Sequence, residues 1–149
     1  MSDGQRSTAL GLLDVLVGEW TLLVSGHGDP TGTITFEWSL GERYLLQRSI
    51  LPAPFPESLA IIEYDEAAGE FRQHYFDSRG VTRIYRMTLL GSEWTLLRTE
   101  ADYSELGFAQ RFVGAIADDG RSVDGRWEQS HDGGQTWELD FGLRFERQP

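Results

Sequence analysis

The amino-acid sequence predicts an all-β protein, an up-and-down antiparallel β-barrel of about ten strands with a short N-terminal helix. Two observations lead to this prediction. Beyond residue 18, almost every segment alternates apolar and polar residues with a period of two, as strands with one buried face do. Short clusters of Gly, Asp, Ser and Pro separate the segments at hairpin spacing, and no long helical pattern intervenes, so parallel strands are not expected.

The first predicted element is a helix in the segment TALGLLDVL. Leucines recur there at three-residue spacing from residue 10 to residue 16, which is typical of one face of a helix. Ser7 is suited to cap the N-terminus of this helix, and Gly18 is expected to end it. Residues 1–6 are expected to be flexible.

The strands that follow are expected at residues 19–27, 32–39, 42–51, 58–65, 70–78, 81–90, 93–100, 107–117, 122–131 and 135–146. Such a meander must bury one face of each strand and protect its edges, and closure into a barrel achieves both. A barrel of about this strand number leaves room inside for a small ligand, and the helix would plug one end. A two-sheet sandwich is the alternative.

Composition limits the classes of function. The 149 residues are enough for one domain over residues 1–149, and the net charge of −11 disfavours binding to nucleic acid or to anionic membranes. The absence of cysteine excludes disulfides and thiolate chemistry. No signal-like or membrane-spanning apolar run occurs, so a cytoplasmic protein is expected, either a monomer or a homodimer.

The segment SHDGGQTW matches the Asp-box motif through Ser130, Asp132, Gly134, Thr136 and Trp137. We interpret the motif as a hairpin turn between the last two strands. The carboxylate of its Asp can accept backbone N–H groups, its Gly can adopt positive φ, and its Trp can cover the turn. These roles explain every specified position without a ligand. In the strand that follows, alternation predicts a shared inner face for Trp137, Leu139, Phe141, Leu143 and Phe145.

The segment VGEW places Gly18 and Trp20 at the entry to the first strand, while Arg144 and Arg147 lie on the last strand. This pairing resembles the calycin superfamily, which includes lipocalins and fatty-acid-binding proteins. The resemblance implies that an arginine of the final strand, for which we take Arg144, packs against the tryptophan of the first. A guanidinium can stack on an indole and bind nearby carbonyls, which would close one end of the barrel.

Two longer segments, IIEYDEAAGEFRQHYFDSRGVTRIYRMTL and GRWEQSHDGGQTWELDFGLRFER, resemble a family of uncharacterised bacterial lipocalin-like proteins. The resemblance spans residues 10–147 and implies a calycin-like barrel without implying an activity. The nitrobindins, which are ten-strand haem-binding barrels, are a more distant resemblance. They imply a histidine ligand in the C-terminal part of the barrel, but the final strand here contains no histidine.

Polar side chains that share the more apolar face of a strand are candidates for a ligand-binding site inside the barrel. This criterion, with the one histidine well inside a predicted strand, selects Tyr44, Arg48, His74, Arg98, Gln110, Trp127 and Gln129. Arg98, Gln110 and Gln129 are expected to be neighbours on three adjacent strands. Replacement of Arg98 by alanine is then expected to weaken ligand binding with little loss of fold.

The favoured function is the binding of a small, mainly apolar or amphipathic molecule, with Arg48 or Arg98 meeting an acidic end. The alternative is a small-barrel isomerase, cyclase or lyase with His74 or Glu63 as its acid or base. Haem binding through His74 is a third possibility. No metal site is expected, because His27, His74 and His131 lie on separate elements.

Overall fold

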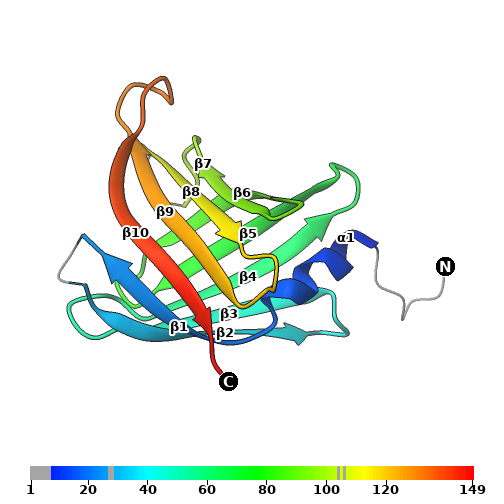
Figure 1. Cartoon of the computed structure of the whole chain (residues 1–149). Helices are drawn as coiled ribbons and strands as arrows, with labels where there is room; N and C mark the ends of the chain where they lie inside the picture. Colours follow the sequence, from blue (N-terminus) through cyan, green and yellow to red (C-terminus); the bar gives the residue numbers. More distant parts are fainter. Residues whose placement is uncertain (1–7, 27–28, 104, 106) are drawn as a thin grey trace.

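The protein forms a closed barrel of ten antiparallel strands, here described from a computed structural model that covers residues 8–26, 29–103, 105 and 107–149 (Figure 1). The strands are β1 (Gly18–Ser25), β2 (Thr31–Ser39), β3 (Tyr44–Ile50), β4 (Ser58–Asp65), β5 (Glu70–Asp77), β6 (Thr82–Leu90), β7 (Glu93–Arg98), β8 (Ala109–Ile116), β9 (Ser122–Ser130) and β10 (Glu138–Arg147). Each pairs with its neighbours in sequence, and β1 also pairs with β10. The predicted barrel is confirmed, and the sandwich alternative is wrong because the sheet closes on itself.

The predicted N-terminal helix is present in two parts. An α-helical turn, α1 (Thr8–Gly11), continues as the 3₁₀ segment η1 (Leu12–Leu16). Its leucines at positions 10, 13 and 16 are buried in the same core cluster as the inward side chains of the barrel. The helical segment therefore covers one end of the barrel, as Figure 1 shows. The predictions of a Ser7 cap and of flexible residues 1–6 lie outside the described residues.

The two ends of the barrel have different connections. At the helical end, tight turns join β2 to β3, β4 to β5, β6 to β7 and β8 to β9. At the opposite end three of the connections are longer, over residues 51–57, 99–108 and 131–137, while residues 78–81 join β5 to β6. We call this second end the open end. None of the described helices is long and apolar enough to cross a membrane.

Arg147 closes the helical end. Its guanidinium lies 4.1 Å from the centre of the Trp20 ring and donates hydrogen bonds to the carbonyls of Val15 (2.6 Å), Val17 (2.6 Å) and Gly120 (3.1 Å). These bonds tie the helical segment and the β8–β9 turn to the last strand. The geometry is the one that the calycin resemblance implies.

Two details of this motif differ from or add to the prediction. Arg144, which we expected to stack on the first-strand tryptophan, is exposed and pairs with Glu146, because its position on β10 points outward. Gly18 has a φ of +127°, and a Cβ atom there would lie 2.7 Å from Nη1 of Arg147. Glycine at this position therefore lets the arginine reach the carbonyl of Val17.

Hydrogen bonds within the Asp-box shape the β9–β10 hairpin. Oδ1 of Asp132 accepts the N–H groups of Gln135 (3.0 Å) and Thr136 (2.8 Å), and Oγ of Ser130 accepts the N–H of Gly134 (2.9 Å). The hydroxyl and N–H of Thr136, with the hydroxyl of Ser130, lower the pKa of Asp132 to about 2. The Trp137 ring lies beside Gly134. Local backbone bonding thus accounts for the motif.

Beyond the hairpin, a β-bulge corrects our assignment of faces on β10. The register with β9 shifts between Leu139 and Phe141, which inserts an extra residue and exchanges the two faces. Leu139 is consequently 66 % exposed, and Trp137 stacks against Arg111 with its ring centre 4.2 Å away. From Phe141 onward the predicted inner face is correct, and Phe145 is buried in the core.

Candidate ligand-binding cavity

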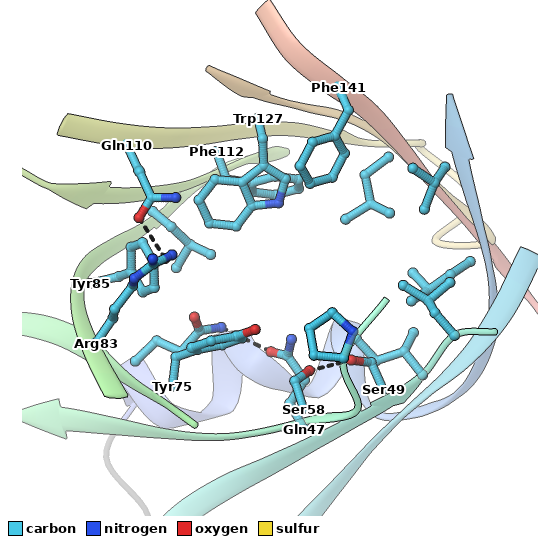
Figure 2. Close-up of a pocket in the computed structure, with 18 of the residues that line it drawn as sticks. Gln47, Ser49, Ser58, Tyr75, Arg83, Tyr85, Gln110, Phe112, Trp127 and Phe141 are labelled. Atoms are coloured by element: carbon cyan, nitrogen blue, oxygen red, sulfur yellow. Dashed lines mark hydrogen bonds between the residues drawn. The ribbon is translucent and has the colours of Figure 1, made fainter. Parts of the chain in front are cut away.

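A cavity of about 370 Å³ lies inside the barrel, between the core at the helical end and the loops of the open end. Its position follows from its lining, which includes inward side chains of the strands together with Phe55, Pro56, Arg79 and Phe108 from the open-end connections. The volume falls within the range of small-molecule sites, at the lower end of about 300–1,000 Å³. Figure 2 shows the side chains that surround this space.

One side of the cavity is aromatic. Phe112 of β8, Trp127 of β9 and Phe141 of β10 form it, and we call these three residues the aromatic wall (Figure 2). The ring centres of Phe112 and Trp127 lie 5.5 Å apart, and those of Trp127 and Tyr85 lie 5.4 Å apart. Such a surface can pack against an apolar ligand over a large area.

Two glycines position the aromatic wall. Gly114 of β8 and Gly125 of β9 face each other across the strands, and the Phe112 ring lies over both. A Cβ atom at Gly125 would lie 2.6 Å from Cε1 of Phe112 and 3.1 Å from the Leu143 carbonyl oxygen. Glycine at these positions therefore allows the ring to lie flat on the sheet beside the cavity.

We expect Gly125→Ala to lower the free energy of unfolding by about 1–3 kcal/mol, the usual range for overpacking a core. The new methyl group would lie 2.6 Å from Cε1 of Phe112, so this 1 % exposed ring must shift from its packing against Trp94 and Phe145. Urea unfolding measures the change. Gly11→Ala is the control, since no atom lies within 4 Å of a Cβ there. Equal stability of the two variants would show that the Phe112 ring is not fixed by the glycines.

The opposite side of the cavity is polar. Gln47 and Ser49 of β3 and Ser58 of β4 lie there (Figure 2), and Gln73 of β5 lies beside Gln47; we call these four residues the polar wall. Nε2 of Gln73 donates to Oε1 of Gln47 at 3.0 Å, and the two serine hydroxyls bond to each other. Gln73 is only 2 % exposed, so this polar surface belongs to the interior of the barrel.

Beside the polar wall, Tyr75, Asp77 and Arg79 form a hydrogen-bonded group near the open end. The Asp77 carboxylate accepts the Tyr75 hydroxyl at 2.8 Å and pairs with Nη2 of Arg79 at 2.6 Å. Burial alone would raise the pKa of Asp77, but the bonds from Arg79 and Tyr75 prevail and lower it to about 2. Burial and the bond to Asp77 raise the pKa of Tyr75. The charge of Arg79 is therefore neutralised within the protein.

Arg83 of β6 also lines the cavity, next to Tyr85 and Gln110. Figure 2 shows the side chains of Arg83 and Gln110 pointing toward one another at one side of the space. The Tyr85 hydroxyl donates to Oε1 of Gln110 at 3.2 Å. Burial raises the pKa of Tyr85, and the neighbouring Arg83 guanidinium opposes this shift. Nε of Arg83 is buried and has no hydrogen-bond partner among the described residues.

Two of the predicted site residues, Tyr44 and Arg48, lie on the wrong face of β3 for a role in the cavity. The buried and cavity-lining positions of this strand are Leu45, Gln47 and Ser49, so Tyr44 and Arg48 point outward, and Arg48 is exposed. The error arose because the outer face of β3 is the more apolar one. Arg48 therefore does not meet a ligand in the cavity.

His74 and Glu63 also lie on the outer surface of the barrel. The inward positions of β5 are Phe71, Gln73 and Tyr75, and Nε2 of His74 lies 3.3 Å from Oε2 of Glu63 on the outer face. The geometry of this pair does not amount to a hydrogen bond. Neither residue reaches the cavity, so the predicted acid–base and haem-ligand roles find no place there.

A haem group would not find its predicted ligand in this barrel. Histidine is absent from the cavity lining in the described ranges, and these ranges contain no cluster of three or more His, Asp or Glu side chains that suits a metal ion. The described lining therefore does not fit a histidine-ligated haem.

Arg98, Gln110 and Gln129 are directly opposite one another on β7, β8 and β9, in the arrangement that the sequence predicts. Their surroundings differ. Gln110 lines the cavity, as Trp127 does, whereas Arg98 and Gln129 are not part of the lining. Arg98 is 3 % exposed and binds Asp102 through two hydrogen bonds, from Nε (2.9 Å) and Nη2 (3.0 Å).

Sequence reasoning missed several lining residues, above all Gln47, Gln73 and Arg83. For Arg83 a signal exists, because it shares the face of Tyr85, Met87 and Leu89 on β6, all of which are buried. For Gln47 the available signal is misleading, since the opposite face of β3 carries more apolar residues.

No family model and no curated protein matches this sequence. Among solved structures, the crystal structure of Rv2717c from M. tuberculosis is similar, with a TM-score of 0.67 and 16 % sequence identity. The match covers 97 % of this chain and 100 % of that one. At this identity the likeness shows the barrel fold alone, and membership of a lipocalin-like or nitrobindin family stays a prediction.

Proposed function

We propose that this protein binds a small, mainly apolar molecule inside its barrel. The observation that carries the proposal is the cavity of about 370 Å³, which is lined by three aromatic side chains on one side and bordered by residues of the open-end connections. Burial of apolar surface against such a wall stabilises a complex by roughly 25 cal/mol per Å² before the costs of association. The polar side chains around the same space give an amphipathic ligand its orientation.

A catalytic function receives less support from the geometry. The enzyme alternative depends on His74 or Glu63, and both side chains lie on the outer face of the barrel. The polar groups that do line the cavity are amides, hydroxyls and arginines, with Asp140 at the β10 bulge. Binding is therefore the function that this cavity supports best.

The test compares a substitution that blocks the cavity with one on the same strand that points outward. Ser58 lines the cavity, whereas its neighbour Leu59 points outward on β4. We expect Ser58→Phe to weaken binding of an anilinonaphthalene sulfonate probe by about tenfold or more, because the ring fills ligand space. Leu59→Phe is expected to leave the affinity unchanged.

Fluorescence titration measures both affinities, and circular dichroism establishes that both variants fold. Equal affinity of the two folded variants, or no saturable binding to the wild-type protein, would contradict a ligand site inside the barrel.

A further inference from the structure

The two walls of the cavity face each other across the barrel. In the closed strand order, β8, β9 and β10 lie opposite β3, β4 and β5. The aromatic wall on the first group therefore looks across the cavity at the polar wall on the second, as Figure 2 shows. A ligand between them meets apolar surface on one side and hydrogen-bonding groups on the other.

The polar wall retains unused hydrogen-bonding capacity. The bond between Gln73 and Gln47 uses one donor and one acceptor of the two amides. Nε2 of Gln47 and Oε1 of Gln73 make no further hydrogen bond to the residues that the structure describes. Since neither atom is a buried group lacking a partner, both are open to the cavity space. A polar group on one edge of the ligand can therefore accept a hydrogen bond from Gln47 and donate one to Gln73.

Arg83 supplies a positive charge to the cavity lining. Within the described ranges it has no carboxylate at ion-pair distance, whereas Arg79 in the same lining is paired with Asp77. Its nearest neighbours on the inward face, Tyr75 and Tyr85, are neutral phenols. Nε of Arg83 is buried and has no hydrogen-bond partner among the described residues, so we expect a bound ligand to supply the acceptor. A carboxylate suits this position because its two oxygens can accept two parallel N–H bonds from the planar guanidinium.

Building on the proposed function, we propose that the ligand is a flat, ring-containing carboxylate with a hydrogen-bonding substituent on one edge. Its ring packs against Trp127 and Phe112, its carboxylate binds Arg83, and its substituent bonds to Gln47 and Gln73. A plain alkyl chain fits this cavity less well, because it would cover the two amides without bonding to them. Leaving a buried amide group unpaired costs about 1–3 kcal/mol.

Calorimetric titration with four probes tests this assignment: 6-hydroxy-2-naphthoate, 2-naphthoate, 2-naphthalenemethanol and decanoate. In the wild-type protein we expect 2-naphthoate to bind about tenfold more tightly than the neutral alcohol, since a charge-assisted bond is worth more than a neutral one. The hydroxyl of 6-hydroxy-2-naphthoate should raise the affinity several-fold above that of 2-naphthoate. Decanoate should bind more weakly than 2-naphthoate.

Two variants assign these preferences to residues. Arg83→Gln should remove the preference for the anion over the alcohol, while Arg86→Gln, an exposed position on the same strand, should keep it. Gln73→Leu should remove the advantage of the added hydroxyl and keep the preference for the anion. A variant that loses one of these preferences and keeps the other must be folded and still bind the probes. This result distinguishes the loss of a specific contact from a general loss of structure.

The outcomes separate the two proposals. Equal affinities for 2-naphthoate, the alcohol and decanoate would overturn the ligand class and leave the binding function intact. Preferences that persist in Arg83→Gln and Gln73→Leu would overturn the assignment to these residues. Saturable binding of none of the probes, including the naphthalene sulfonate, would contradict the binding function itself.

Discussion

Replacement of Arg98 by alanine is expected to lower the free energy of unfolding by about 3–5 kcal/mol, the range for breaking a buried ion pair by removal of one partner. Both side chains of the pair are inaccessible, with 3 % exposure for Arg98 and 9 % for Asp102. Oδ2 of Asp102 also accepts the N–H of Ile84 at 2.8 Å. Loss of the arginine therefore leaves a buried carboxylate that still anchors part of β6.

Equilibrium unfolding in urea measures this effect, and a double variant is the control. Arg98→Met combined with Asp102→Asn removes both charges and retains an acceptor for the Ile84 N–H. We expect it to recover part of the stability that Arg98→Ala loses. A cost below about 1 kcal/mol for Arg98→Ala, with weaker probe binding, would restore the ligand-binding role that the sequence predicted.

Replacement of Arg147 by alanine is expected to cost about 2–4 kcal/mol at the other end of the barrel. A hydrogen bond from a charged group contributes about 1.5–3 kcal/mol, and three carbonyls lose their donor together, although partial exposure reduces each contribution. The buried Trp20 indole also loses the guanidinium that covers one face of its ring. Thermal and urea unfolding both report the change.

Two further variants distinguish the geometry of Arg147 from its charge. Arg147→Lys keeps the charge without the fork, so we expect it to recover only a minor part of the loss. Arg144→Ala removes an arginine of the same strand that is exposed and pairs only with Glu146 among the described residues, so a change within about 0.5 kcal/mol is expected. Equal costs at the two arginines would show that the helical end is not closed by Arg147.

The barrel was predictable because local and global signals agree over most of the chain. Alternation with turn residues at regular spacing defines ten hairpin-connected strands, and the observed boundaries differ from the expected ones by a few residues at most. Closure follows from the need to protect strand edges. Parity could also have selected Arg147 over Arg144. Arg147 shares the inward face of Phe145 on the last strand, whereas Arg144 lies on the opposite face.

The candidate site was less predictable, for a physical reason that β3 illustrates. The usual rule places the apolar face of a strand inward, but here Gln47 and Ser49 line the cavity while Leu46 and Ile50 point outward. A cavity that holds polar groups reverses the hydrophobic signal locally. The bulge near Asp140 reverses it again on β10, and neither reversal leaves a mark in the alternation itself.

The measurement that tests the central claim most directly is a titration of ¹⁵N-labelled protein with 2-naphthoate, followed through the tryptophan indole N–H signals. The five tryptophans report on different places. Trp127 belongs to the aromatic wall, whereas Trp137 stacks on Arg111 at the surface and Trp38 donates to Asp14 at the helical end. We predict a saturable shift of the Trp127 signal, with the Trp137 and Trp38 signals unchanged. Shifts confined to Trp137 or Trp38 would place the ligand outside the barrel and contradict the proposed function.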